Sequence, residues 1–158
     1  MKIVVVSDTH GNNAAILDIM SREPDAKMLL HCGDICADDR EISSKISCPM
    51  HIVSGNMDFG SYYPNEEVIE VEGHTIFMCH GNRQYVKYGL QELIDAANDV
   101  CADIALFGHT HVSMVDMVPG LWLMNPGSPV YSRNPSRLGT YGIIEIEGEK
   151  TNCFLKKY

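Results

Sequence analysis

Residues that can bind metal ions follow short apolar runs in this sequence. The first run, residues 3–6, leads directly into Asp8-x-His10. A continuous Ile/Val run is typical of a strand buried on both faces, so Asp8 and His10 should lie just past its carboxyl end. Side chains two residues apart on an extended segment point the same way. A carboxylate and an imidazole placed like this could therefore bind one metal ion.

Four further apolar runs end in the same way. Each is followed by Asp, Asn or His, close to a glycine. The runs are 28–30 before Gly33-Asp34, 51–53 before Gly55-Asn56-Met57-Asp58, 75–78 before Cys79-His80-Gly81, and 104–107 before Gly108-His109-Thr110-His111. Ligands of open α/β sheets bind at the carboxyl ends of the strands, so we expect the five segments to converge on one site.

The candidate ligands are two carboxylates, one amide and four imidazoles: Asp8, His10, Asp34, Asn56, His80, His109 and His111. Mixed oxygen and nitrogen ligands suit Mn, Fe, Zn, Co or Ni better than Ca or Mg, and Mn is our first choice. Seven ligands are too many for one transition metal with an open position. They fit two metals if one carboxylate, most simply Asp34, bridges them. Two metals about 3.5–4 Å apart are a recurring device for phosphoester hydrolysis, in which a hydroxide held between them attacks phosphorus.

Five motifs therefore follow one another along the chain: Asp8-x-His10, Gly33-Asp34, Gly55-Asn56-x-Asp58, His80 and Gly108-His109-x-His111. In their order and spacing, from Met1 to about Ser128, the chain resembles the calcineurin-like metallophosphoesterase superfamily, and its short length is similar to the compact prokaryotic phosphodiesterase branch. The resemblance implies an α/β fold, a four-layer α/β/β/α sandwich of two mixed β-sheets flanked by helices, with a binuclear metal centre. It also implies that Asp8, His10, Asp34 and His111 hold one metal, and that Asp34, Asn56, His80 and His109 hold the other.

The rest of the pattern predicts helices and hairpins around these strands. Helical periodicity predicts a helix at 13–22 with Asn12 or Asn13 as its N-cap, a weaker helix at 38–46 and an amphipathic stripe from Val86 to Ala97. Hairpins are predicted around Glu72-Gly73 and Gly148-Glu149, and strands at 112–118 and 121–124. At 158 residues, without a linker or an internal repeat, we expect one domain spanning 1–158.

Composition limits the classes of function. The net charge of -9 argues against broad binding to nucleic acid, whose phosphates attract basic proteins. The chain has neither a signal-like N-terminus nor a long apolar run, so we expect a cytoplasmic protein that does not act in a membrane. The six cysteines are then expected to be reduced thiols, with Cys32 and Cys79 acting as small buried hydrophobic residues. The sequence is compatible with a monomer and with a homo-oligomer.

Several residues near the motifs are candidates for catalysis or substrate binding. We expect Asp34, Asn56 and Asp58 to act in catalysis, Asp58 by orienting Asn56 or a neighbouring ligand. Many family members carry a histidine, thought to protonate the leaving group, where this chain has Met57, whose thioether has no proton to donate. Substrate contacts are expected at the turn after the run 121–124, from Asn125, Gly127 and Ser128. Three arginines could bind phosphate, but we favour ordinary surface positions for them: Arg83, Arg133 and Arg137. The remaining histidines are expected to be structural or surface residues: His31, His51 and His74.

The leading hypothesis is a metal-dependent phosphodiesterase that acts on a small phosphodiester. A phosphomonoesterase or nucleotidase is an alternative, which Met57 makes weaker. A protein-interaction scaffold is another, since a eukaryotic retromer subunit uses this fold to bind proteins, but all seven ligand positions here hold competent residues. A mononuclear iron oxygenase with two histidines and a carboxylate would leave several of these residues without a role.

Overall fold

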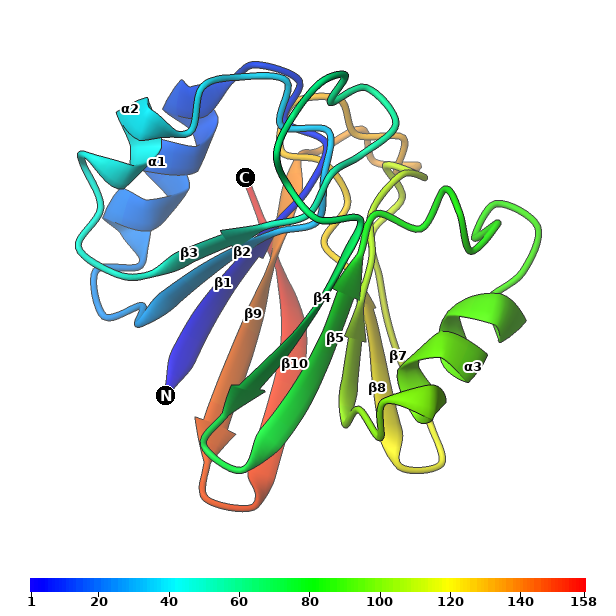
Figure 1. Cartoon of the computed structure of the whole chain (residues 1–158). Coiled ribbons are helices and arrows are strands. Elements are labelled where there is room, and N and C mark those ends of the chain that lie inside the picture. The colour runs from blue at the N-terminus through cyan, green and yellow to red at the C-terminus, as the bar shows by residue number, and fades with distance from the viewer.

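The computed structural model describes all 158 residues as two packed β-sheets with helices outside them (Figure 1). Each sheet has five strands and mixes parallel with antiparallel pairs. The elements are β1 (Lys2–Val6), α1 (Asn13–Arg22), β2 (Met28–His31), α2 (Arg40–Ser43), β3 (Met50–Ile52), β4 (Glu66–Val71), β5 (His74–Cys79), α3 (Gln91–Asp99), β6 (Ile104–Leu106), β7 (Met114–Val118), β8 (Leu121–Asn125), β9 (Thr140–Glu147) and β10 (Lys150–Lys157).

The first sheet has the strand order β10-β9-β1-β2-β3. Strands β1, β2 and β3 are parallel. Strands β9 and β10 form the predicted closing hairpin, in which β9 pairs antiparallel to β1 and β10 pairs antiparallel to β9. Residues 3–6 of β1 are completely buried, as expected for a central strand covered on both faces. The second sheet has the order β4-β5-β6-β8-β7, with β5, β6 and β8 parallel. The turn between β4 and β5 has positive φ at both Glu72 and Gly73, a conformation that matches the right-handed twist of the two strands.

Three apolar layers hold these elements together. The largest lies between the sheets and joins side chains such as Val5 and Leu30 to Ile76 and Leu106. A second layer lies under α1 and α2, and a third packs α3 against the outer face of the second sheet. This arrangement confirms the predicted α/β/β/α sandwich. No helix in it is both long and apolar enough to cross a membrane.

Two predicted helices are shorter than the sequence pattern suggested. The segment 38–46 is helical only over α2, where Ile42 is the one buried residue. The stripe from Val86 to Ala97 becomes a helix only from Gln91 onward. Val86 is buried in a turn instead, where its methyl groups fill the space beside Gly81. Its apolar character therefore reflects tertiary packing and not helical periodicity.

A buried carboxylate, Glu23, ties the end of α1 to the first sheet. It accepts hydrogen bonds from Lys156 Nζ at 2.7 Å, from the Tyr141 hydroxyl at 2.8 Å and from Lys2 Nζ at 3.3 Å. Burial by itself raises the pKa of Glu23, but these donors together hold the pKa below its ordinary value. The ionised carboxylate is thus the form that stabilises the fold.

We expect Glu23→Gln to lower the free energy of unfolding at pH 7 by about 1–3 kcal/mol, because hydrogen bonds to a charged group are lost. Since the pKa of Glu23 is lower in the folded protein, its contribution is complete above the unfolded pKa and disappears as pH falls through the folded pKa. The difference between wild type and variant should therefore shrink at acidic pH. Urea unfolding from pH 7 to pH 3 measures this, with the exposed Glu92→Gln as the control. A difference that does not change with pH would contradict this role.

Candidate metal centre

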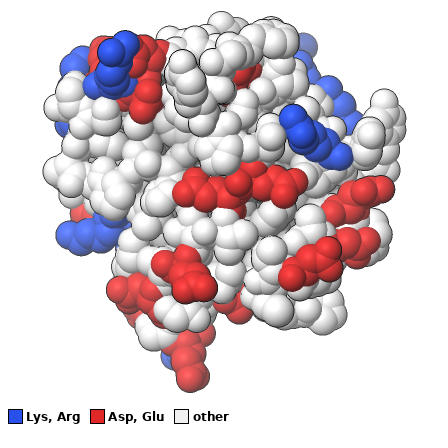
Figure 2. All heavy atoms as spheres, in the orientation of Figure 1, with Lys and Arg blue, Asp and Glu red and all other residues white.

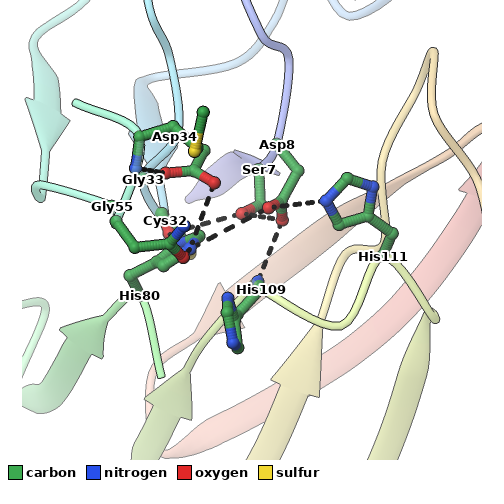
Figure 3. A network of polar contacts seen from close by, with 12 residues as sticks. Ser7, Asp8, Cys32, Gly33, Asp34, Gly55, His80, His109 and His111 are labelled. Atoms are coloured by element: carbon green, nitrogen blue, oxygen red, sulfur yellow. Dashed lines mark hydrogen bonds and ion pairs between the residues drawn. The ribbon is translucent and has the colours of Figure 1, made fainter. Parts of the chain in front are cut away.

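The segments that follow β1, β2, β3, β5 and β6 meet at one edge of the sandwich, where their polar side chains converge (Figure 3). Two groups of potential ligand atoms form there, each with its atoms within 4.8 Å of one another. Asp8, His10 and His111 make the first group, and Asp8, Asp34 and His80 make the second. Five of the seven residues predicted from sequence thus come together in space.

The backbone at these residues is unusual. Five of the ten non-glycine residues with positive φ are predicted ligands: Asp8, His10, Asp34, His109 and His111. Residues other than glycine seldom adopt a positive φ, and residues with such a strained backbone cluster at functional sites. Two glycines allow the chain to pass close to the carboxylates. A Cβ on Gly55 would lie 2.1 Å from Asp34 Oδ1, and one on Gly108 would lie 1.9 Å from Ser7 Oγ.

The two oxygens of the Asp8 carboxylate have different surroundings. Oδ2 accepts hydrogen bonds from Ser7 Oγ at 2.6 Å and from the backbone N–H of His109 at 3.0 Å. Oδ1 is buried and has no hydrogen-bond partner, yet it lies 3.2 Å from His111 Nε2 and 4.0 Å from His80 Nε2. A buried carboxylate oxygen without a donor is costly, so this atom points to a bound cation.

The imidazoles of His111 and His80 are also oriented as metal ligands would be. His111 Nδ1 lies 2.9 Å from the carbonyl oxygen of Tyr131, and His80 Nδ1 lies 2.7 Å from that of Cys32. A carbonyl accepts, so each Nδ1 must carry the proton, which leaves each neutral ring with a lone pair on Nε2. Backbone partners of this kind commonly fix the tautomer of histidines that bind metals.

Potential ligand atoms of several residues face one another across the centre of the site. His10 Nε2 is 3.4 Å from His111 Nε2, and Asp34 Oδ2 is 3.5 Å from His80 Nε2 and 4.0 Å from His10 Nε2. A proton can satisfy one such pair, but only a metal ion can satisfy three or more acceptors at once. Asp34 Oδ2 thus faces histidines of both groups. Asp8, and not Asp34, is the residue that belongs to both groups, a sharing that the sequence did not suggest.

The electrostatics agree with a set of ionised carboxylates. Burial by itself raises the pKa values of Asp8 and Asp34, but hydrogen bonds and charges from the histidines hold both pKa values below the ordinary value. Burial lowers the pKa of His109 to about 4, so this ring is neutral at pH 7 and its nitrogen is free to bind a metal.

Two predicted ligands lie at the margin of the site. Asn56 is exposed, and its Oδ1 is 3.2 Å from His80 Nε2. The ring of His109 packs edge-on against that of His80, with 5.1 Å between centroids, but it belongs to neither compact group. The assignment of both residues as ligands remains a prediction.

The residues expected to contact substrate at 125–128 are buried next to the ligand loops, and their contact with a substrate stays a prediction. Asn125 and Ser128 are fully buried. The Asn125 side chain donates to the Gly108 carbonyl and accepts from Gly127 N–H, and Ser128 Oγ donates to the Asp8 carbonyl. Because their polar groups are used within the fold, they support the ligand loops.

Asp58 also supports the ligand loops. It is buried, and its carboxylate accepts the backbone N–H groups of Cys36 at 2.7 Å and Gly55 at 2.8 Å. These bonds hold together the loops that carry Asp34 and Asn56. These contacts agree with the orienting role that we expected for Asp58, and that role stays a prediction.

Two neighbours of the ligands were missed or left without a specific role by sequence reasoning. The thiol of Cys36 is 3.7 Å from His10 Nδ1, and burial raises its pKa to about 11. Its position two residues after Asp34 was the available signal. His31, expected to be structural or on the surface, is buried: Nδ1 accepts from Gly33 N–H at 3.2 Å and Nε2 lies 2.9 Å from Thr9 Oγ1. Cys32 and Cys79 are buried as expected.

An open cavity of about 560 Å³ lies against the first ligand group, lined by His10, His111, Tyr131, Ser132 and Arg133. Arg133 is fixed beside it by a backbone hydrogen bond from its N–H to the His111 carbonyl. This guanidinium gives the cavity a positive charge suited to phosphate. Arg137 lines a neighbouring cavity together with Arg133, and Arg83 is exposed elsewhere on the surface.

Comparison with known proteins places this geometry in a family. Residues 1–149 match the model of the calcineurin-like phosphoesterase superfamily domain. A probable metallophosphoesterase of Methanothermobacter thermautotrophicus is 32% identical over 97% of this chain and 90% of that protein. The crystal structure of a predicted phosphoesterase from Streptococcus pneumoniae has a TM-score of 0.88 at 27% identity, covering 99% of this chain and 88% of that one. Vps29 of Entamoeba histolytica in complex with Zn²⁺ shares the fold, with a TM-score of 0.80 at 21% identity and 99% coverage of both chains. The chain therefore belongs to the calcineurin-like phosphoesterase superfamily.

Proposed function

We propose that this protein is a phosphodiesterase that uses two divalent transition-metal ions, Mn first among them, to hydrolyse small phosphodiesters. The observation that carries the proposal is the convergence of Asp8 Oδ1, Asp34 Oδ2 and three imidazole Nε2 atoms, among which Asp8 Oδ1 is buried without a hydrogen-bond partner. Bound cations would satisfy these acceptor atoms together.

Different residues would bind the metal ions and the substrate. Asp8, His10 and His111 would hold one ion, Asp34 and His80 the other, and Asp34 would fix the distance between the two. Bound ions would supply Lewis acidity, which lowers the pKa of a coordinated water and neutralises charge on the phosphoryl oxygens. The exposed Asn56 amide can donate to a phosphoryl oxygen, and Arg133 can attract the anionic substrate to the cavity mouth.

Small substrates fit the charge of the molecule better than polyanions do. The net charge is -9, and Figure 2 shows more acidic than basic side chains on the face that it displays. All six cysteines are free thiols, as a cytoplasmic location would require. We retain that location as part of the proposal.

A protein-interaction scaffold is the second candidate, favoured by the fold similarity to Vps29. A scaffold has no need of a buried carboxylate oxygen without a donor, so we rank it below the enzyme. A phosphomonoesterase is the remaining alternative, and a substrate panel of aryl phosphodiesters, cyclic nucleotides and phosphomonoesters with added Mn²⁺ separates it from a phosphodiesterase.

We expect the protein to bind two metal ions per chain, because ligand atoms form two groups. Elemental analysis after reconstitution with Mn²⁺ and removal of free metal measures the ratio, and anomalous scattering locates the ions. His51→Ala serves as the control, since His51 pairs with Glu67 away from the site and its loss should leave the ratio unchanged. Saturation at one ion per chain would refute the binuclear proposal.

Replacing Asp34 by Asn should lower kcat by about 10²-fold or more and weaken metal binding, because the bridging negative charge is lost. The fold should stay intact, since the apolar layers do not depend on this side chain. Steady-state kinetics at saturating metal and circular dichroism, run in parallel, decide the outcome. Turnover close to that of wild type in the folded, metal-loaded variant would show that Asp34 does not bridge.

The rate should fall steeply as the leaving group becomes more basic, because no histidine is free to protonate it. His31 is buried, His51 pairs with Glu67, and His74 bonds to Gly148 at the far end of β5. A positioned general acid contributes about 10²–10⁴-fold for poor leaving groups. Met57→His should therefore flatten a plot of log kcat/KM against leaving-group pKa for aryl and alkyl methyl phosphodiesters. A wild-type plot that is already flat, with chemistry rate-limiting, would mean that another acid is present.

A further inference from the structure

A cavity of about 720 Å³ opens beside the metal centre, between the loop that follows β2 and the loop that follows β3. It is distinct from the cavity that contains Arg133, since the two share no lining residue. Cys36, Met57, Phe59, Tyr62 and Tyr63 form much of its wall.

The wall of this cavity is continuous with the metal ligands. Cys36 Sγ lies 3.7 Å from His10 Nδ1, and the backbone N–H of Met57 donates to Asp34 Oδ1 at 2.7 Å. Asp58 also lines the cavity, and its carboxylate accepts the backbone N–H groups of Cys36 in the loop after β2 and of Gly55 in the loop after β3. A group bonded to a phosphate at the metal centre can therefore extend directly into this space.

Large apolar side chains at the cavity have nothing to cover them. The side chain of Phe59 is 85% exposed, that of Tyr62 is fully exposed and that of Met57 is 48% exposed. Single exposed hydrophobic residues are ordinary, but a cluster of them around a cavity marks a binding surface. Aromatic rings in such a place offer flat faces for stacking.

The charge around the cavity selects against a second anion. Asp38, Asp39 and Asp58 line it, and the one guanidinium, that of Arg40, is already bound to Asp38 through contacts of 2.6–2.9 Å. A ligand that carries a further phosphate would be repelled here. The opposite holds for the other cavity, which carries Arg133 and no carboxylate.

We propose that this cavity is a subsite for a neutral aromatic group of the phosphate ester, such as an aryl ring or a nucleobase, which stacks on Phe59 and Tyr62. The proposal rests on the proposed function, because the metal centre must hold the phosphate. It names the class of substrate, a diester with one planar aromatic substituent, and excludes diphosphates.

The test is direct binding, so it does not depend on turnover. Calorimetric titration of the Mn²⁺-loaded protein compares three probes: methylphosphonate, benzylphosphonate and cyclohexylmethylphosphonate. Benzylphosphonate should bind about tenfold more tightly than methylphosphonate, because its ring can stack on aromatic side chains of the cavity. Phe59→Ala and Tyr62→Ala should each remove most of this advantage and leave the affinity for methylphosphonate unchanged. Tyr88→Ala, which removes a ring equally exposed but outside the cavity, is the matched control and should change nothing.

Each outcome has a separate meaning. Equal affinity for benzylphosphonate and methylphosphonate in the wild type would overturn the subsite and leave the metal centre intact. Equal affinity for the benzyl and cyclohexylmethyl probes would overturn the requirement for an aromatic group. Failure of all three probes to bind the metal-loaded protein would count against the proposed function itself.

Discussion

One buried oxygen, Asp8 Oδ1, imposes the main constraint on this structure. Leaving an ionised acceptor without a donor costs about 1–3 kcal/mol or more, and the nearest side-chain atom here is the Nε2 of His111, at 3.2 Å. The surrounding bonds keep the carboxylate in this state. Ser7 and the backbone of His109 occupy its other oxygen, and backbone carbonyls fix the protons of His80 and His111 on the far sides of their rings. The site is thus built to be completed by cations.

The fold must stabilise this arrangement from a distance. Five predicted ligands have positive φ, at a cost on the order of 1–3 kcal/mol each. The apolar layer between the sheets and the layers under the helices contain most of the fully buried side chains, and they fix the strand ends from which the ligand loops start. Within the loops, Asp58, Asn125 and Ser128 use buried polar groups to join one loop to another. These residues lie next to the candidate metal ligands and connect the loops that carry them.

The surroundings of the metal centre are asymmetric. On one side, Arg133 provides positive charge beside His10 and His111. On the other, Phe59 and Tyr62 stand above a wall with an excess of carboxylates. An ester bound between them would have its anionic part directed one way and its neutral organic part the other. In the proposed enzyme, the distribution of charge would orient the substrate without a large enclosing pocket.

Local signals in the sequence predicted the strands, the segments that carry the candidate ligands and the family. Apolar runs followed by glycine and a ligand residue predict buried strands with functional ends, because both signals are local. The four-layer arrangement followed from the same pattern and the resemblance, and the structure confirmed it. Which polar residues come together at the site depends on how the segments pack in three dimensions. Ser128 was expected to touch substrate but bonds to the Asp8 carbonyl, Cys36 was missed although it lies beside His10, and the cavity with Phe59 arises from two loops. The physical reason is that a side chain's direction after a strand depends on backbone turns with positive φ and on contacts between segments far apart in the chain. Residue type and spacing do not contain that information.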